Sequence, residues 1–115
     1  MNDSILTDIK KLIGIDEDDT EFDTDIIIAI NSVIEVLREI GIGPESGLMI
    51  TDKTTKWSAL LGDDVRLNTV KTFMYLKVRQ IFDPPKTSAA AEAANSLIKE
   101  FEWRLYAHAE NESNS

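Results

Sequence analysis

Apolar side chains recur at helical spacing in four segments of the chain, residues 4–14, 24–41, 63–82 and 89–109. Recurrence at three and four residues indicates amphipathic helices that bury one face. Ser4 can cap the first helix and Gly14 can end it. This helix is short, and we expect it to pack as a satellite of the others. The pattern therefore predicts a mainly α protein, a small bundle of about four helices.

Residues 24–41 give the clearest pattern. One broad arc carries seven apolar side chains, namely Ile26, Ile27, Ile30, Val33, Ile34, Leu37 and Ile40. Asn31 and Ser32 lie on the polar side, and Ile28 falls outside the arc as a single exposed residue. Thr24 or Asp23 is the expected N-cap, preceded by Phe22 as a hydrophobic staple against the first turn.

The helix expected over residues 63–82 is apolar on more than one side. Its main face holds Leu67, Val70, Met74, Val78 and Ile81, and Asp63 or Asp64 is the expected cap. Val65 and Leu76 project to the opposite side, while Phe73, Tyr75 and Phe82 widen the stripe. A helix that is apolar nearly all round is normally buried on several sides. We expect it to be the central helix, or to offer a face to another chain.

A rigid elbow is predicted where "IFDPPKTS" ends this helix. Pro84 and Pro85 lack the backbone donor and disfavour helical geometry at the residues before them, so Asp83 to Pro85 fix the angle between two helices. Thr87 or Ser88 can cap the next helix. Its core face is expected to hold Ala90, Ala94, Leu97, Ile98, Phe101 and Leu105. Trp103 and Tyr106 point away from that face and are candidates for an interface, where aromatic residues are enriched.

The stretch between the second and third helices has a different character. Gly41, Gly43, Pro44 and Gly47 disfavour a helix. Residues 48–51 and 54–57 are either a short β-hairpin or an extended loop, and a hairpin alone is only marginally stable. Other elements should therefore hold this stretch. One apolar turn follows, which Trp57, Leu60 and Leu61 are expected to anchor.

The amino-acid composition limits the kinds of binding site and catalytic site that the chain can form. The 115 residues include no cysteine and carry a formal net charge of −9, which argues against gripping DNA through phosphate contacts. Seven acids occupy residues 16–25, but Glu21 and Ile27 stand where an EF-hand loop requires Gly and Glu, so a calcium site is not expected. His108 is the single histidine, and because general-base work needs an oriented partner we expect it to be a packing or surface residue. We expect no enzyme activity, no cofactor, no metal and no membrane span.

The charges are distributed unevenly. Residues 16–25 carry no base, whereas Arg66, Lys71, Lys77 and Arg79 lie on the third helix. In head-to-tail association one subunit offers a surface different from the one it receives, and closure gives a ring. One hypothesis is that the acidic segment of one subunit approaches Lys71 and Lys77 of the next.

The order of these elements resembles the small head–tail connector (head completion or neck adaptor) proteins of tailed bacteriophages and prophages. The resemblance rests on "FDTDIIIAIN", "WSALLGDD" and "LKVRQIFDPP", and it covers roughly residues 4 to 105. It implies a structural, non-enzymatic subunit that forms a ring below the portal protein at the virion neck, after assembly in the bacterial host cytoplasm. Such a ring extends the channel through which DNA passes without specific binding and offers a docking surface to the next neck or tail component.

Under this interpretation the chain is one helical domain, residues 1–110, with a polar disordered tail at 111–115. The candidate contacts with other subunits or the portal are Leu48, Met49, Ile50, Lys71, Leu76, Lys77, Trp103 and Tyr106. An alternative also follows from the charge: an acidic helical protein that mimics DNA and occupies a nucleic-acid-binding partner. The concentration of its acids in one linker, rather than along a helical face, disfavours this alternative.

Overall fold

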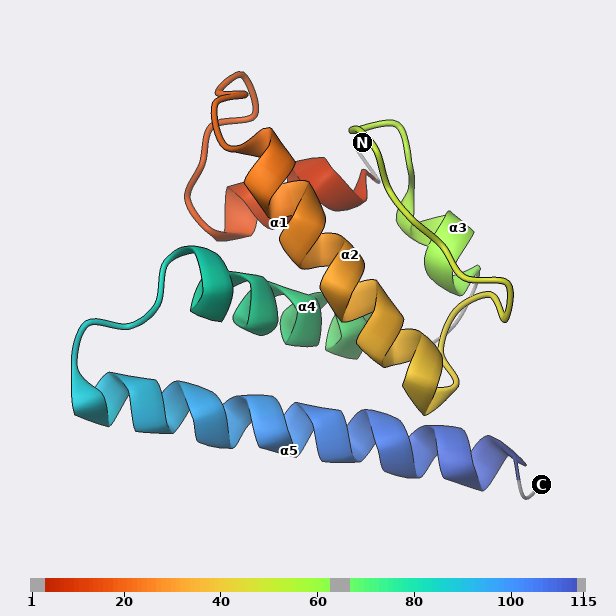
Figure 1. Cartoon of the computed structure of the whole chain (residues 1–115). Helices are drawn as coiled ribbons and strands as arrows, with labels where there is room; N and C mark the ends of the chain where they lie inside the picture. Colours follow the sequence, from red (N-terminus) through yellow and green to blue (C-terminus); the bar gives the residue numbers. More distant parts are fainter. Residues whose placement is uncertain (1–3, 63–66, 114–115) are drawn as a thin grey trace.

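Five helices form the architecture in a computed structural model that describes residues 4–62 and 67–113. They are α1 (Ile5–Leu12), α2 (Asp23–Ile40), α3 (Trp57–Leu61), α4 (Leu67–Phe82) and α5 (Ser88–Ser113). In Figure 1, α2 crosses α4 obliquely, and α5 runs back antiparallel to α4 beneath it. The prediction of a small, mainly helical bundle is confirmed.

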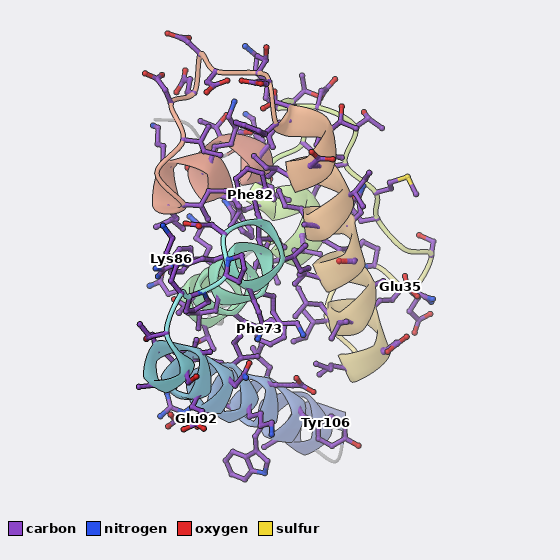
Figure 2. The ribbon with its side chains drawn as sticks, turned by 60° about the vertical axis from the view of Figure 1, so that its left-hand side comes forward. Glu35, Phe73, Phe82, Lys86, Glu92 and Tyr106 are labelled. Atoms are coloured by element: carbon purple, nitrogen blue, oxygen red, sulfur yellow. The ribbon has the colours of Figure 1, made fainter. Side chains whose placement is uncertain are left out.

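The central helix is α4, as its all-round apolar sequence predicts. It packs against α1, α2 and α5. Val70, Phe73, Met74 and Val78 are fully buried, and Figure 2 shows Phe73 in the interior. The expected cap at Asp63 or Asp64 and the position of Val65 lie outside the described residues. The prediction for Ile81 is wrong, because 60% of this residue is exposed.

The first helix is part of the core, so the satellite prediction is wrong. Ile5 and Ile9 have no exposed surface, whereas Leu12 at the helix end is 49% exposed. Ser4 caps the helix by accepting a hydrogen bond from the Thr7 backbone N–H at 3.2 Å, as predicted. Gly14 ends it at a φ of 84°, where a left-handed conformation favours glycine.

The second helix buries the predicted arc. Ile26, Ile30, Val33, Ile34 and Leu37 are buried, and Ile28 is 62% exposed, as expected. The predicted cap is wrong: the N-cap position is Phe22, whose side chain makes no capping hydrogen bond. Asp23 is not free to cap, because its carboxylate pairs with Lys10.

An extended loop, not a hairpin, joins α2 to α3. Among residues 41–56 the structure contains no strand, and the loop instead returns to α1. Lys56 forms an isolated antiparallel bridge with Ser4, and the Ile5 N–H donates to the Thr55 carbonyl at 3.1 Å. Trp57 and Leu60 on α3 are buried and Leu61 is half-buried, so the predicted anchoring is confirmed.

The last helix, α5, packs on α4 through a face that is slightly rotated from the predicted one. Ile98 and Leu105 are buried and Phe101 is half-buried, whereas Leu97 is 40% exposed and Ala90 is exposed. The buried stripe is therefore centred between Ile98 and Leu105. The helix continues to Ser113, which includes the first residues of the predicted 111–115 tail. The side chain of His108 lies outside the described part of the chain.

Candidate interaction surfaces

Within the acidic segment, residues 16–25, one buried cation organises residues 16–21. Lys10 is 2% exposed, and its Nζ lies 3.1 Å from the Glu17 carbonyl oxygen and 2.6 Å from that of Asp19. The same ammonium lies 2.8 Å from Oδ1 of Asp23 at the start of α2. The six side chains of residues 16–21 remain exposed. The segment is therefore a fixed acidic surface rather than a loose linker.

A second polar cluster joins α1, α3 and α4. Oδ2 of Asp8 accepts a hydrogen bond from Nε1 of Trp57 at 2.8 Å and from Nζ of Lys71 at 3.3 Å. The Lys71 ammonium also lies 5.2 Å from the centre of the Trp57 ring, in cation–π geometry. Lys71 therefore has partners inside its own chain. The hypothesis that the acidic segment of another subunit approaches α4 therefore depends more on Lys77 than on Lys71. Lys77 is half-buried.

The loop residues predicted as contacts divide between core and surface. Ile50 is 1% exposed and belongs to the core, Leu48 is half-buried against it, and Met49 is 72% exposed. Successive side chains of an extended segment point to opposite sides, which explains this alternation. The prediction of Ile50 as a contact residue is wrong in this respect, because its side chain faces the protein interior.

Asn31 holds this loop in place. Its Nδ2 donates to the Ile50 carbonyl at 3.0 Å, and its Oδ1 accepts from the Ile50 N–H at 2.8 Å. One amide side chain thus makes the pair of hydrogen bonds that a neighbouring strand would otherwise make. The sequence pattern predicts that other elements hold this loop, but it does not identify Asn31 as the residue that does so.

The outer face of α5 carries the predicted aromatic pair. Trp103 is 69% exposed and Tyr106 is 57% exposed, and with Lys99 and Glu102 they line a shallow depression. Figure 2 shows Tyr106 on the side of α5 that faces away from the other helices. Leu76, another predicted contact, is half-buried against the core. Trp103, Tyr106 and Met49 are thus the predicted apolar contacts that reach the surface.

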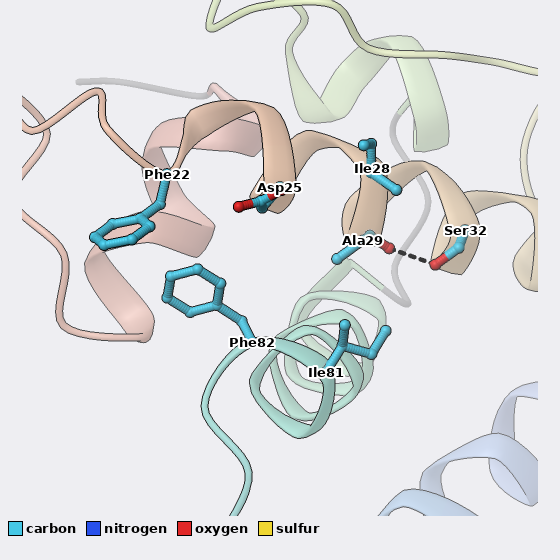
Figure 3. Close-up of a pocket in the computed structure, with 7 residues that line it drawn as sticks. All are labelled: Phe22, Asp25, Ile28, Ala29, Ser32, Ile81 and Phe82. Atoms are coloured by element: carbon cyan, nitrogen blue, oxygen red, sulfur yellow. Dashed lines mark hydrogen bonds between the residues drawn. The ribbon is translucent and has the colours of Figure 1, made fainter.

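An apolar groove that the sequence does not predict as a site lies between the start of α2 and the end of α4. Its volume is about 790 Å³, and its lining is Phe22, Asp25, Ile28, Ala29, Ser32, Ile81 and Phe82. Phe22 and Phe82 meet edge to face with ring centres 5.3 Å apart, so Phe22 does not act as a simple staple (Figure 3). Ile28 and Ile81 supply most of the exposed apolar surface.

The elbow joins α4 to α5 through residues 83–87. The Asp83 N–H donates to the Arg79 carbonyl at 2.7 Å, so the backbone bonding of α4 continues to the first residue of the predicted elbow. Thr87 caps α5, accepting from the Ala90 N–H at 3.1 Å, as predicted. Gln80 on α4 also donates a hydrogen bond to Asn95 on α5. The helix break at Pro84 and Pro85 therefore lies between two helices that pack on each other.

The titratable groups with shifted pKa values lie on the surface. Hydrogen bonding to Arg38 lowers the pKa of Glu35, and hydrogen bonds from Thr54 lower the pKa of Asp52. Both shifts come from local pairs. Within the described residues no group of three or more His, Asp or Glu side chains could hold a metal ion, and no helix has the length and hydropathy of a membrane span.

Comparison with known proteins identifies a family model that matches most of the chain. The model of the family described as "Phage connector protein" matches residues 5–112. No curated protein and no solved structure matches the chain significantly.

Proposed function

The chain belongs to the phage connector protein family, whose members are structural proteins of the virion neck. On this basis we propose that copies of the chain form a ring below the portal protein. The ring extends the DNA channel and offers a docking surface to the next neck or tail component. Assembly takes place in the bacterial cytoplasm, from a phage or prophage gene.

The main support for this proposal is the apolar surface exposed on two separate faces of the molecule. The groove exposes Ile28 and Ile81, and the outer face of α5 exposes Trp103 and Tyr106. Single exposed apolar residues are ordinary, but clustered patches rimmed by polar groups are typical of protein–protein contacts. A subunit that contacts neighbours on two sides needs two such faces.

The charge of the chain supports passage of DNA rather than binding. Its formal net charge is −9, and the Lys10 contacts fix the acidic segment as an exposed surface. Phosphate binding depends on clustered Lys and Arg, so an acidic wall interacts weakly with a moving duplex. The same feature is the basis of the alternative function, a DNA mimic that binds a basic partner.

Native mass spectrometry of the purified protein over a range of concentrations, with and without the cognate portal protein, tests the proposal. We expect a closed oligomer of defined stoichiometry, in the free protein or when the portal is present. A monomer that ignores the portal at every concentration would contradict the ring. If that monomer bound basic DNA-binding proteins with a steep salt dependence, the DNA-mimic function would replace it.

The elbow gives a further prediction. Replacing Pro84 and Pro85 together by Ala should lower the free energy of unfolding by only about 1–2 kcal/mol, largely by giving the unfolded chain more freedom. Ring formation should fall more strongly, because the elbow no longer constrains how α5 is presented. Urea unfolding and native mass spectrometry measure the two effects.

Pro44→Ala is the matched control for the elbow variant, since Pro44 lies in the other long loop. It should lose a similar amount of stability per proline and retain its rings. Normal rings from the Pro84/Pro85 double variant would show that helix packing alone fixes the angle.

A further inference from the structure

The two apolar surfaces have different shapes. The groove between α2 and α4 is a hollow of about 790 Å³, whereas Trp103 and Tyr106 are large side chains exposed on one helix. They belong to different sides of the molecule: Figure 2 shows Phe82, at the groove, and Tyr106 well apart. One molecule therefore presents both a hollow and an exposed aromatic pair, and because they lie on different sides it cannot insert one into the other.

The apolar areas of the two surfaces are similar. Ile28 and Ile81 are 62% and 60% exposed and Phe22 is 37% exposed, against 69% for Trp103 and 57% for Tyr106. With ordinary side-chain areas, each surface exposes roughly 300 Å² of these residues. Each patch can therefore cover the other without leaving much apolar surface in water.

The charges beside the two surfaces are opposite. Asp25 lines the groove and is exposed, and Lys99 lines the depression beside Trp103 and is exposed. Among the described residues neither side chain has an ion-pair partner. Arg104, the nearby cation on α5, is already paired with Glu100 at 2.6 Å. A carboxylate at the hollow and an ammonium at the aromatic pair can thus meet at the edge of a contact.

We propose that the occupant of the groove is a second copy of this chain, which inserts Trp103 and Tyr106 between α2 and α4 and pairs its Lys99 with Asp25. This inference rests on the proposed function and specifies its subunit contact. The contact is heterologous: each copy gives its aromatic pair to one neighbour and its groove to the other. Repetition of such a contact closes into a ring when the rotation between copies allows it.

The size of the contact indicates that it is weak between two isolated copies. A stable interface buries about 800 Å² on each partner, and the apolar centres supply less than half of this. Polar residues around them must supply the remainder as a rim. We therefore expect rapid exchange between free subunits and lasting association only where several contacts form together.

Disulfide trapping can detect such a weak contact, because the chain has no cysteine of its own. One variant carries Ser32→Cys in the groove, and the other carries Glu102→Cys beside Trp103. Mixed in equal amounts under mild oxidation, they should form the heterodimer about tenfold faster than a control mixture. The control pairs Glu102→Cys with Ser58→Cys, an exposed serine on α3.

A third variant tests the role of the aromatic residue. Adding Trp103→Ala to the Glu102→Cys chain should remove the rate difference, because truncation of a central aromatic residue weakens a contact by about thirtyfold. Leu97→Ala is its control, since Leu97 is an exposed apolar residue on another side of α5. It should leave the rate unchanged. Circular dichroism and urea unfolding establish that each variant is folded.

Equal rates for the Ser32 and Ser58 mixtures would overturn the proposal. So would complete loss of the 32–102 disulfide when the portal protein is added, which would make the portal the occupant. The proposed function is tested separately by the closed oligomer. A closed oligomer without fast 32–102 trapping would support the ring and contradict this contact. Fast trapping without any closed oligomer, free or on the portal, would support the contact and contradict the ring.

Discussion

Replacing Lys10 by Met is expected to lower the free energy of unfolding by about 3 kcal/mol. The Lys10 ammonium is buried and is shared by two carbonyl oxygens of the acidic segment and by the Asp23 carboxylate. Met has a similar length and an apolar side chain, so little cavity forms. The variant leaves the Asp23 carboxylate without its cation. Because the Asp23 side chain is 26% exposed, water screens part of the free-energy cost of this unpaired charge. The expected loss therefore lies at the low end of the range for a broken buried ion pair. Urea unfolding measures the loss.

Lys11→Met is the matched control. Lys11 is the next residue on α1, but its side chain is 58% exposed and lies 3.8 Å from Glu17. Its loss should change stability by less than about 0.5 kcal/mol. Adding Asp23→Asn to Lys10→Met should restore part of the stability, since it removes the unpaired charge. Equal losses for Lys10→Met and Lys11→Met would contradict the role of Lys10 as the centre of the acidic segment.

Replacing Asn31 by Ala is expected to cost about 2 kcal/mol and to release the loop between α2 and α3. Both backbone groups of Ile50 lose their partner, while the Ile50 side chain stays buried. A buried polar group without a partner costs more than an average hydrogen bond contributes. Hydrogen exchange should show the Ile50 amide losing its protection ahead of the amides within α2.

The neighbouring residue supplies the control for this loop. Ser32→Ala removes a hydroxyl that donates only to the Ala29 carbonyl of the same helix. We expect Ser32→Ala to change stability by less than about 0.5 kcal/mol and to leave the Ile50 amide protected. If Asn31→Ala left that amide equally protected, the loop would have to be held by its bridge to α1 and its apolar contacts.

Features that depend on local sequence could be predicted. The Ser4 and Thr87 caps, the stop at Gly14 and the break at Pro84 and Pro85 each follow from backbone chemistry within a few residues. The buried arc of α2 follows from a strict period of apolar residues. The aromatic pair on α5 could be found for the same reason, because helical periodicity alone places it opposite the packed face.

The groove and the contacts of Lys10 and Asn31 could not be predicted in this way. Ile81 shares a helical face with Met74 and Val78, but α2 crosses α4 obliquely, so the two helices diverge and leave Ile81 uncovered (Figure 1). Lys10 and Asn31 lie on polar positions that ordinarily face water. Their partners are fixed only when a loop folds over them, and helical periodicity contains no information about that loop.

The contacts of Asp8 also set an order of events during synthesis. Its partners Trp57 and Lys71 come 49 and 63 residues later in the chain, and the backbone partner of Ile5 is Thr55. On the ribosome α1 emerges long before these residues, and a helix of eight residues is not stable by itself. It can pack on α2 earlier, but its contacts with α3 and α4 cannot form until those helices have emerged. Although α1 is made before α2, α3 and α4, its docking is complete only after all three have emerged.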